Sequence, residues 1–181
     1  MMNHDDQMKS VVREYFDEVA AIRTGDSSAV ARLMALWDPD AVLHVVGPQG
    51  EAGWPREYRG SEAIHGRFND MMNAAKRGVE LKPGGAPVGF GVTVVLHSVD
   101  VVESKATAHV AITLHTNEKR PRGFEIHSGK FEFEFKSGKL SSVTENVDFN
   151  RAIEPRIAGI RQRDLSVSDI GRLTLAAWAI A

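Results

Sequence analysis

The feature that most constrains the fold is a strand pair running from Phe124 to Phe149, FEIHSGKFEFEFKSGKLSSVTENVDF. Two strand-like runs lie on either side of Ser137-Gly138. A two-residue loop of this composition suits a β-hairpin, because glycine readily takes a positive φ. Antiparallel partners point to the same face of a sheet. The pairing register therefore decides which polar residues lie beside the phenylalanines.

Counting back from the turn predicts the cross-strand pairs. They are Lys136 with Lys139, Phe135 with Leu140, Phe133 with Ser142, Phe131 with Thr144, Gly129 with Asn146, and His127 with Asp148. One face then carries three phenylalanines and ends in a His–Asp pair, whereas the opposite face pairs Lys130 with Glu145. A slip of one residue would instead place Glu145 among the phenylalanines, because side chains alternate between the two faces.

Composition excludes several classes of protein. A chain of 181 residues suits one domain with a normal core. The net charge of −2 and the lack of a long Lys/Arg block disfavour nucleic-acid binding. The chain has no cysteine, which excludes disulfides and thiol catalysis. The acidic N-terminus lacks the apolar core of a signal peptide, and no window approaches the roughly 18 apolar residues of a membrane span. We expect a soluble, cytoplasmic protein.

Apolar periodicity predicts three helices with one early strand, followed by a meander of strands. The helices are expected over about 5–24, 27–37 and 61–77, and the strands over about 41–46, 92–102, 106–116, 124–136 and 139–149. Residues 47–60 form a long loop that holds Trp54 and Tyr58, which could close over a pocket or pack the loop down. A helical pattern from Asp169 to Ala181 needs a surface to lie on, either its own sheet or a partner subunit.

The run 106–116 alternates between an apolar and a polar face. Its apolar set should join the phenylalanine face, because an antiparallel sheet usually buries one face. His109 and His115 then lie on the outer face. The chain has no HxH or HxxxH spacing, so we expect no metal site. It also lacks a GxSxG motif and a glycine-rich phosphate loop, so we expect no cofactor.

Three motifs in this order, WDPDAVLHVVGP, YRGSEAIHGRF and FKSGKLSSVTENVDF, resemble the nuclear transport factor 2-like superfamily, specifically its SnoaL-like branch. The resemblance covers roughly residues 8–153. It implies an α+β fold, a cone in which a strongly curved, mostly antiparallel sheet packs on three N-terminal helices around a pocket. It also implies a homodimer through the sheet. We expect a SnoaL-like domain over 1–153 and a C-terminal extension over 154–181, whose short helix packs on that domain or on a partner subunit.

The resemblance also suggests roles for two residues. Asp148 matches an acidic residue that often closes the last strand and takes part in acid–base chemistry in some members. His44 matches a histidine that is frequent in the first strand. The chain departs from the family near the end of the last strand, where Val143, Asn146 and Val147 replace the usual aromatics.

His127 and Asp148 are the leading candidates for catalysis, because a carboxylate beside an imidazole orients it as a proton acceptor near neutrality. A structural hydrogen bond at the end of the sheet is the alternative. Tyr15 could bind a substrate oxygen or pack in the core, and His44 could move a second proton or be a satisfied core histidine. Glu145 is the alternate carboxylate if the register slips. The expected pocket lining is Phe68, Phe131, Phe133, Trp54, Tyr58 and Asn146.

Two functions fit these residues. The first is a cofactor-independent enzyme of the cyclase, isomerase or dehydratase type, acting on a small hydrophobic molecule that is cyclic or carries a carbonyl. Polyketide cyclases, ketosteroid isomerases, limonene epoxide hydrolases and dehydratases occur in the superfamily. The second is a non-catalytic protein of the same fold that binds a small apolar ligand or serves as an association domain. A cavity that reaches both His127 and Asp148 favours the enzyme.

Overall fold

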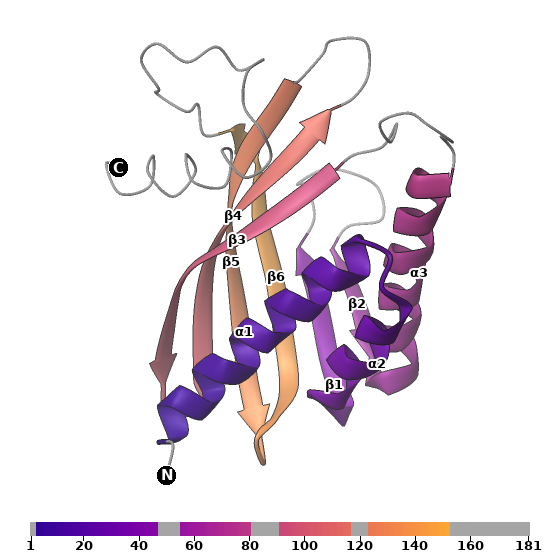
Figure 1. Ribbon diagram of the computed structural model, residues 1–181. Coiled ribbons are helices and arrows are strands. Elements are labelled where there is room, and N and C mark those ends of the chain that lie inside the picture. The colour runs from indigo at the N-terminus through magenta and orange to yellow at the C-terminus, as the bar shows by residue number, and fades with distance from the viewer. Residues whose placement is uncertain (1–2, 47–54, 81–90, 117–122, 153–181) are drawn as a thin grey trace.

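A computed structural model describes residues 3–46, 55–80, 91–116 and 123–152 (Figure 1). Its helices are α1 (His4–Arg23), α2 (Ser27–Ala35) and α3 (Gly60–Glu80). Its strands are β1 (Trp37–Val46), β2 (Arg56–Arg59), β3 (Gly91–Val102), β4 (Lys105–Thr116), β5 (Gly123–Lys136) and β6 (Lys139–Ala152). The predicted extension over 154–181 and its helix lie outside the described residues, as does Trp54.

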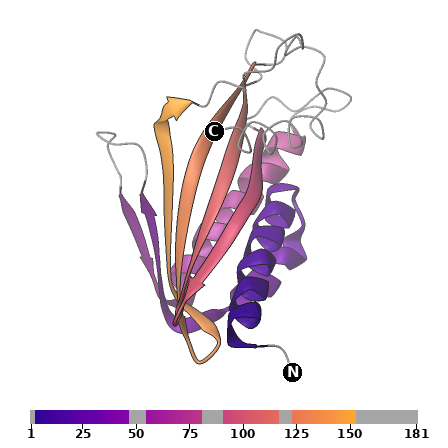
Figure 2. The ribbon, with the colours of Figure 1, turned by 90° about the vertical axis from the view of Figure 1, so that its left-hand side faces the viewer.

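Within the described residues the strands form one six-stranded sheet in the order β2-β1-β6-β5-β4-β3. All neighbouring strands are antiparallel except β1 and β6, which run parallel. The helices lie on one side of the curved sheet (Figure 2). α1 packs across β3 and β4, while α3 packs on β1 and β2. This arrangement is the α+β fold that the sequence predicted, a curved and mostly antiparallel sheet packed on three helices.

Local chemistry sets the helix boundaries. Asn3 caps α1 by accepting a hydrogen bond from the Asp6 backbone N–H at 2.7 Å. Gly25 follows that helix with a φ of 89°, a conformation that favours glycine. Asp26 then caps α2 by accepting from the Ser28 N–H at 2.9 Å. The prediction that α2 extends to Trp37 is wrong, because Trp37 begins β1 and pairs with Leu140.

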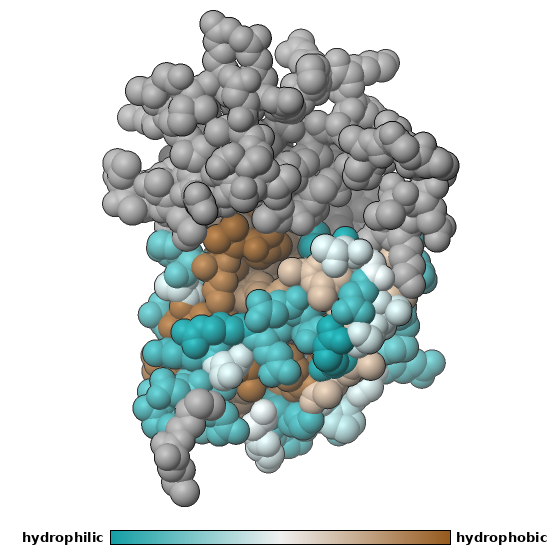
Figure 3. Space-filling model, viewed as in Figure 1, coloured by the Kyte–Doolittle hydropathy of each residue, from teal (hydrophilic) through white to brown (hydrophobic). Residues whose placement is uncertain are grey.

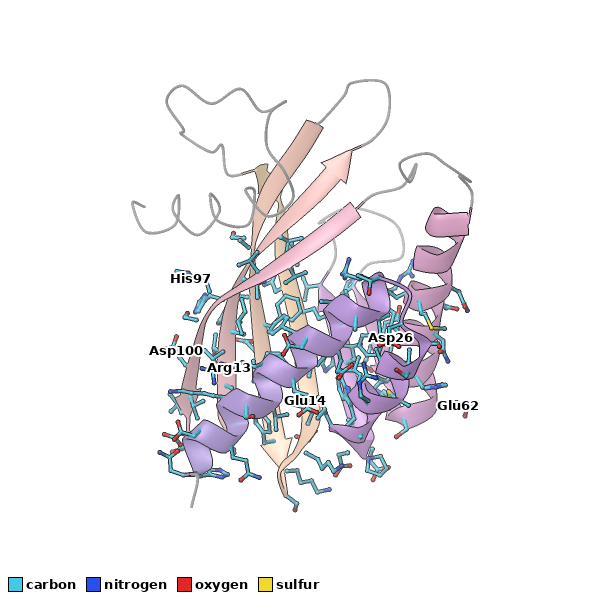
Figure 4. All side chains as sticks on the ribbon, in the orientation of Figure 1. Arg13, Glu14, Asp26, Glu62, His97 and Asp100 are labelled. Atoms are coloured by element: carbon cyan, nitrogen blue, oxygen red, sulfur yellow. The ribbon has the colours of Figure 1, made fainter. Side chains whose placement is uncertain are left out.

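The core lies between the helices and the inner face of the sheet, which is the face that the helices cover. α1 buries a stripe at helical spacing, consisting of Met8, Val12, Tyr15, Phe16, Val19 and Ile22. The inner face of the sheet contributes Leu43, Ala108, Val110, Phe131, Phe133, Leu140 and Val143. The opposite side of α1 carries exposed charged residues such as Arg13 and Glu14, and the surface there is largely hydrophilic (Figures 3 and 4). None of the helices within the described ranges combines the length and apolar content that crossing a bilayer requires.

The turn between β5 and β6 is the predicted one. Ser137 has a φ of 52° and Gly138 a φ of 78°. Two consecutive positive φ values are typical of a type I′ turn, whose twist matches that of the flanking strands. Lys136 pairs with Lys139 and Phe135 with Leu140, as counted from the sequence.

Beyond these two pairs the predicted register is wrong. Glu134 pairs with Ser142, so Ser141 is an extra residue on β6, and its Oγ donates to the Glu134 carbonyl at 3.1 Å. Such a β-bulge places two residues opposite one and shifts every later pair. Phe133 therefore pairs with Val143 and Phe131 with Glu145.

The same bulge changes which residues share the inner face. Gly129 pairs with Val147, and Lys130 pairs with Asn146 on the outer face, not with Glu145. A second irregularity follows, after which the backbone of His127 is in register with Ala152 and not with Asp148. The predicted cross-strand pairs of Lys130 with Glu145 and of His127 with Asp148 are therefore both wrong.

Candidate functional site

The bulge brings Glu145 of β6 onto the inner face, opposite Tyr15 of α1. The Tyr15 hydroxyl donates to Oε1 of Glu145 at 2.7 Å. Tyr15 is fully buried and Glu145 is partly buried. Glu145 is in register with Val45 of β1 and with Phe131 of β5, both of which are buried. A carboxylate thus lies within an apolar wall and is held by a single phenol.

Aromatic rings surround this phenol. The Tyr15 ring makes edge-on contacts with Phe16 and Phe133, at centroid distances of 5.3 Å each. It also makes edge-on contacts with Trp37 at 6.2 Å and with Phe68 at 6.5 Å. These rings displace water from around the phenol, which strengthens the electrostatic interactions that it makes.

Burial, followed by the negative charge of Glu145, raises the pKa of Tyr15 well above its ordinary value of 10. Both causes disfavour the phenolate, because an ionised oxygen here would be poorly hydrated and next to another anion. Tyr15 therefore stays protonated as a hydrogen-bond donor. This fixes the direction of the hydrogen bond, with Glu145 as the acceptor.

Two arginines act on the same pair. Arg23 ends α1 and Arg67 lies on α3, and the charge of each opposes the rise in the pKa of Tyr15. Burial lowers the pKa of Arg23, and the positive charge of Arg67 lowers it further, whereas Glu145 acts in the opposite direction. The Arg23 Nε is buried and has no hydrogen-bond partner among the described residues. The site therefore combines one carboxylate, one neutral phenol and two guanidinium groups.

The structure does not place the predicted catalytic residues together. His127 and Asp148 belong to β5 and β6, but their backbones are not opposite one another. Their side chains lie outside the described part of the structure. Tyr15 is confirmed as a core residue, and the sequence identified Glu145 as the carboxylate that a register slip would bring among the phenylalanines.

His44 lies on the outer face of β1, away from Tyr15 and Glu145. Its Nδ1 is 3.2 Å from Oε2 of Glu57 on β2, and Glu57 also pairs with Arg59. Both side chains of the His44–Glu57 pair are more than one third exposed. They border a hollow of about 440 Å³ lined by His44, Val46, Pro55, Arg56, Glu57 and Thr144. His44 is neither a core histidine nor a neighbour of the inner carboxylate.

The predicted pocket residues divide into three groups. Phe68, Phe131 and Phe133 are buried on the inner side, and their place in a pocket stays a prediction. Tyr58 is partly buried and packs against the core from β2. Asn146 is exposed on the outer face, which makes its assignment to the pocket wrong, and the cause is again the bulge.

The outer face follows the predicted pattern at His109. Its Nε2 is 4.0 Å from Oδ2 of Asp100. Over the residues that the structure describes, no three His, Cys, Asp or Glu side chains are grouped as metal ligands would be.

A signal for the Tyr15–Glu145 pair was present in the sequence. Leu140 and Val143 are three residues apart, so their apolar phase breaks, and alternation resumes from Val143 to Val147. A break of this kind indicates a bulge. Glu145 then stands as a charged residue at an inward position between two valines. Arg23 and Arg67 carry no comparable signal, since each occupies a position on a helix where arginine is ordinary.

No family model and no curated protein matches the sequence. Solved structures do match. The epoxide hydrolase/cyclase-like enzyme SalBIII, with a role in pyran ring formation in the polyether salinomycin, is 17% identical with a TM-score of 0.54, covering 82% of this chain and 96% of its own. A protein named as a SnoaL-like polyketide cyclase from Jannaschia sp. CCS1 is 12% identical with a TM-score of 0.56, covering 80% and 88%.

A nuclear transport factor 2-like protein of unknown function from Exiguobacterium sp. 255-15 is 15% identical, with a TM-score of 0.51 and coverage of 77% of this chain and 98% of its own. At these identities the likeness shows the fold alone. The chain has the nuclear transport factor 2-like fold, as its sequence motifs predicted, and its structural neighbours include SnoaL-like proteins.

Proposed function

We propose that the protein is a cofactor-independent acid–base enzyme that acts on a small hydrophobic molecule, cyclic or bearing a carbonyl, with Glu145 as the group that moves the proton. The observation that carries the proposal is the 2.7 Å hydrogen bond from the buried Tyr15 phenol to Glu145 on the apolar inner face. The names of structural neighbours, among them a polyketide cyclase and an epoxide hydrolase/cyclase-like enzyme, support the same class of chemistry.

The two oxygens of Glu145 take different roles. Oε1 accepts from Tyr15, which holds the carboxylate in one orientation. The described residues make no hydrogen bond to Oε2, so this oxygen is the base that removes a proton from carbon next to a substrate carbonyl and returns it at another position. Tyr15 is thus a positioning residue. This differs from the role predicted from sequence, in which its hydroxyl binds the substrate oxygen.

The surroundings suit this chemistry. Phe131, Phe133 and Phe68 are buried beside the pair and limit the access of water to it. The guanidinium groups of Arg23 and Arg67 favour negative charge nearby, including the enolate oxygen that forms when a proton leaves carbon. Homodimerisation through the sheet and a cytoplasmic location stay predictions.

The test is proton exchange, because it needs no knowledge of the product. The protein is incubated in D₂O with a panel of hydrophobic ketones and β-keto esters, and NMR follows the entry of deuterium next to the carbonyl. Wild type should accelerate exchange in at least one compound, and Glu145→Gln should not. Glu57→Gln is the matched control, since Glu57 is an exposed glutamate on the same sheet. Equal exchange by wild type and Glu145→Gln would remove Glu145 from the mechanism, and binding without exchange would favour the non-catalytic alternative.

A further inference from the structure

Two guanidinium groups from different helices act on the Tyr15–Glu145 pair without an ion pair to Glu145. The charges of Arg23 on α1 and Arg67 on α3 both act at the Tyr15 hydroxyl, which itself contacts Glu145. Within the described residues, however, neither arginine has a carboxylate oxygen within the 4.0 Å of an ion pair. The two cations therefore act on the same hydroxyl without forming an ion pair with Glu145.

The charges in this cluster do not balance. Arg23 and Arg67 contribute two positive charges, Glu145 contributes one negative charge, and Tyr15 is neutral. The two arginines also repel each other, and Arg23 is in addition desolvated. Unpaired charge in a partly buried site is unfavourable, and a monoanion placed between the arginines would relieve it.

Of the three buried side-chain atoms without a hydrogen-bond partner in the described structure, two are donors, and the third is Oε2 of Glu18, whose other oxygen pairs with Arg32. The Arg23 Nε and the Trp37 Nε1 are both buried without a hydrogen-bond partner in the described structure. Guanidinium and indole nitrogens can only donate. Trp37 packs against the rings of Tyr15 and Phe68, so its indole belongs to the same part of the core. Buried donors without acceptors match a ligand group rich in acceptor oxygens.

A carboxylate fits these requirements. A guanidinium presents two parallel N–H groups that match the two oxygens of a carboxylate. One carboxylate carries the single negative charge that balances the cluster, whereas a phosphate carries more. The phenylalanines of the inner face suit a hydrophobic body attached to that carboxylate.

We propose that the interior beside Tyr15 and Glu145 binds the carboxylate of a small hydrophobic organic acid, with Arg23 and Arg67 as its cationic partners. That this acid is the substrate rests on the proposed function, but its binding does not. Glu145 acts on the carbon skeleton next to the carboxylate that the arginines hold.

The test compares each acid with its neutral amide. Phenylacetate and cyclohexanecarboxylate are titrated calorimetrically into the full-length protein beside phenylacetamide and cyclohexanecarboxamide. At least one acid should bind, and its amide should bind at least tenfold more weakly. Arg67→Met and Arg23→Met should each weaken binding of the acid by about tenfold or more, because each removes a charge-assisted contact. Arg13→Met is the matched control, since Arg13 is an exposed arginine of α1 and should leave the affinity unchanged (Figure 4).

Glu145→Gln separates this proposal from the proposed function. Removing the acidic charge should leave binding of the acid intact or tighten it, while proton exchange is lost. Phosphate is titrated as a further arm, and binding of phosphate in preference to both acids would overturn the assignment to a carboxylate. Arg67→Met keeps the test decisive if Arg23→Met does not fold.

The proposal is overturned if neither acid binds, if the amides bind as tightly, or if the arginine variants retain the affinity of wild type. Exchange that depends on Glu145 in neutral ketones, with no effect of either arginine, would overturn the carboxylate site and leave the proposed function standing. Binding of an acid that depends on the arginines, with no proton exchange, would support the carboxylate site and overturn the proposed function.

Discussion

Two pairs that each contain a glutamate, Tyr15–Glu145 and His44–Glu57, lie on opposite faces of the same sheet. On the inner face, the Tyr15 hydroxyl lies 2.7 Å from Oε1 of Glu145, and the phenol is fully buried. On the outer face, Nδ1 of His44 lies 3.2 Å from Oε2 of Glu57, and both side chains are more than one third exposed. By residue type the outer pair is the more conventional acid–base couple. Its exposure allows water to compete with every contact, whereas the inner pair acts among aromatic rings.

Burial, more than residue type, distinguishes the surroundings of these two carboxylates. On the outer face, acids meet lysines, as in the pairs of Lys105 with Glu134 and of Lys130 with Glu132. Such exposed pairs contribute little to stability and are readily screened. Glu145 differs because Ser141 shifts it out of that solvated row and onto the inner face.

The largest expected contrast is in rate. Glu145→Gln should slow proton exchange by about 10²- to 10⁴-fold, the usual contribution of a positioned acid–base group. Glu57→Gln should change the rate by less than about twofold, because it is distant from the inner face. The rates come from the NMR exchange experiment in D₂O. Comparable losses in both variants would show that the two faces are not functionally distinct.

The next contrast concerns packing of the inner face. A Cβ at Gly129 would lie 2.7 Å from Cγ2 of Val110 on the neighbouring strand. Gly129→Ala should therefore lower the free energy of unfolding by about 1–3 kcal/mol, the usual cost of overpacking. Gly66→Ala is the control, because a Cβ there meets nothing within 4 Å and α3 gains about 0.5–1 kcal/mol from the better helix former. Urea unfolding measures both changes.

Tyr15→Phe should cost stability at the inner pair. The change removes the donor to Glu145 and leaves a carboxylate oxygen without its partner. The free energy of unfolding should fall by about 1–2 kcal/mol, the lower part of the range for a buried group left unsatisfied, since Glu145 is only partly buried. A loss as small as that of the outer pair would contradict the difference in burial.

Alkaline titration examines the same phenol without changing its packing. The pKa of Tyr15 is raised in the folded protein, so the unfolded chain releases this proton first as the pH rises. Its contribution to stability should be complete below about pH 10, the ordinary tyrosine value, and should be lost as the pH rises toward the folded pKa. The chain has two tyrosines. Half of the phenolate absorbance should therefore appear only well above pH 10 or together with unfolding. Tyr15→Phe should remove this half of the absorbance change.

The smallest effect is expected at the outer pair. His44→Gln removes the exposed contact with Glu57, and exposed ion pairs contribute about 0–1 kcal/mol. The free energy of unfolding should change by less than about 0.5 kcal/mol, and this small change should shrink further in high salt. Urea unfolding at two salt concentrations measures it. A loss as large as that of Tyr15→Phe would place His44 in a role that its exposure does not suggest.

Local periodicity, caps and backbone preferences in the sequence predicted the three helices, five of the six described strands and the turn at Ser137-Gly138. The prediction missed β2, which lies inside the expected loop over 47–60, and began β1 at residue 41 and not at Trp37. It also placed Phe131, Phe133 and Tyr15 in the core, since apolar alternation marks the buried face of an element. It wrongly predicted His127 opposite Asp148 and Asn146 in the pocket, because both predictions depend on a strand register that the bulge changes.

Only the tertiary structure decided the partner of Glu145. One extra residue at Ser141 reverses the predicted facing of the β6 side chains from Ser142 to Val147. Such a bulge depends on pairing with β5 and on packing against β1 and α1. Arg23 and Arg67 are far apart in the chain, and only the packing of α1 against α3 lets both charges act on the Tyr15 phenol. Local sequence preferences set most of the elements and mark the break in β6, whereas the site arises from strand pairing and helix packing between residues far apart in the chain.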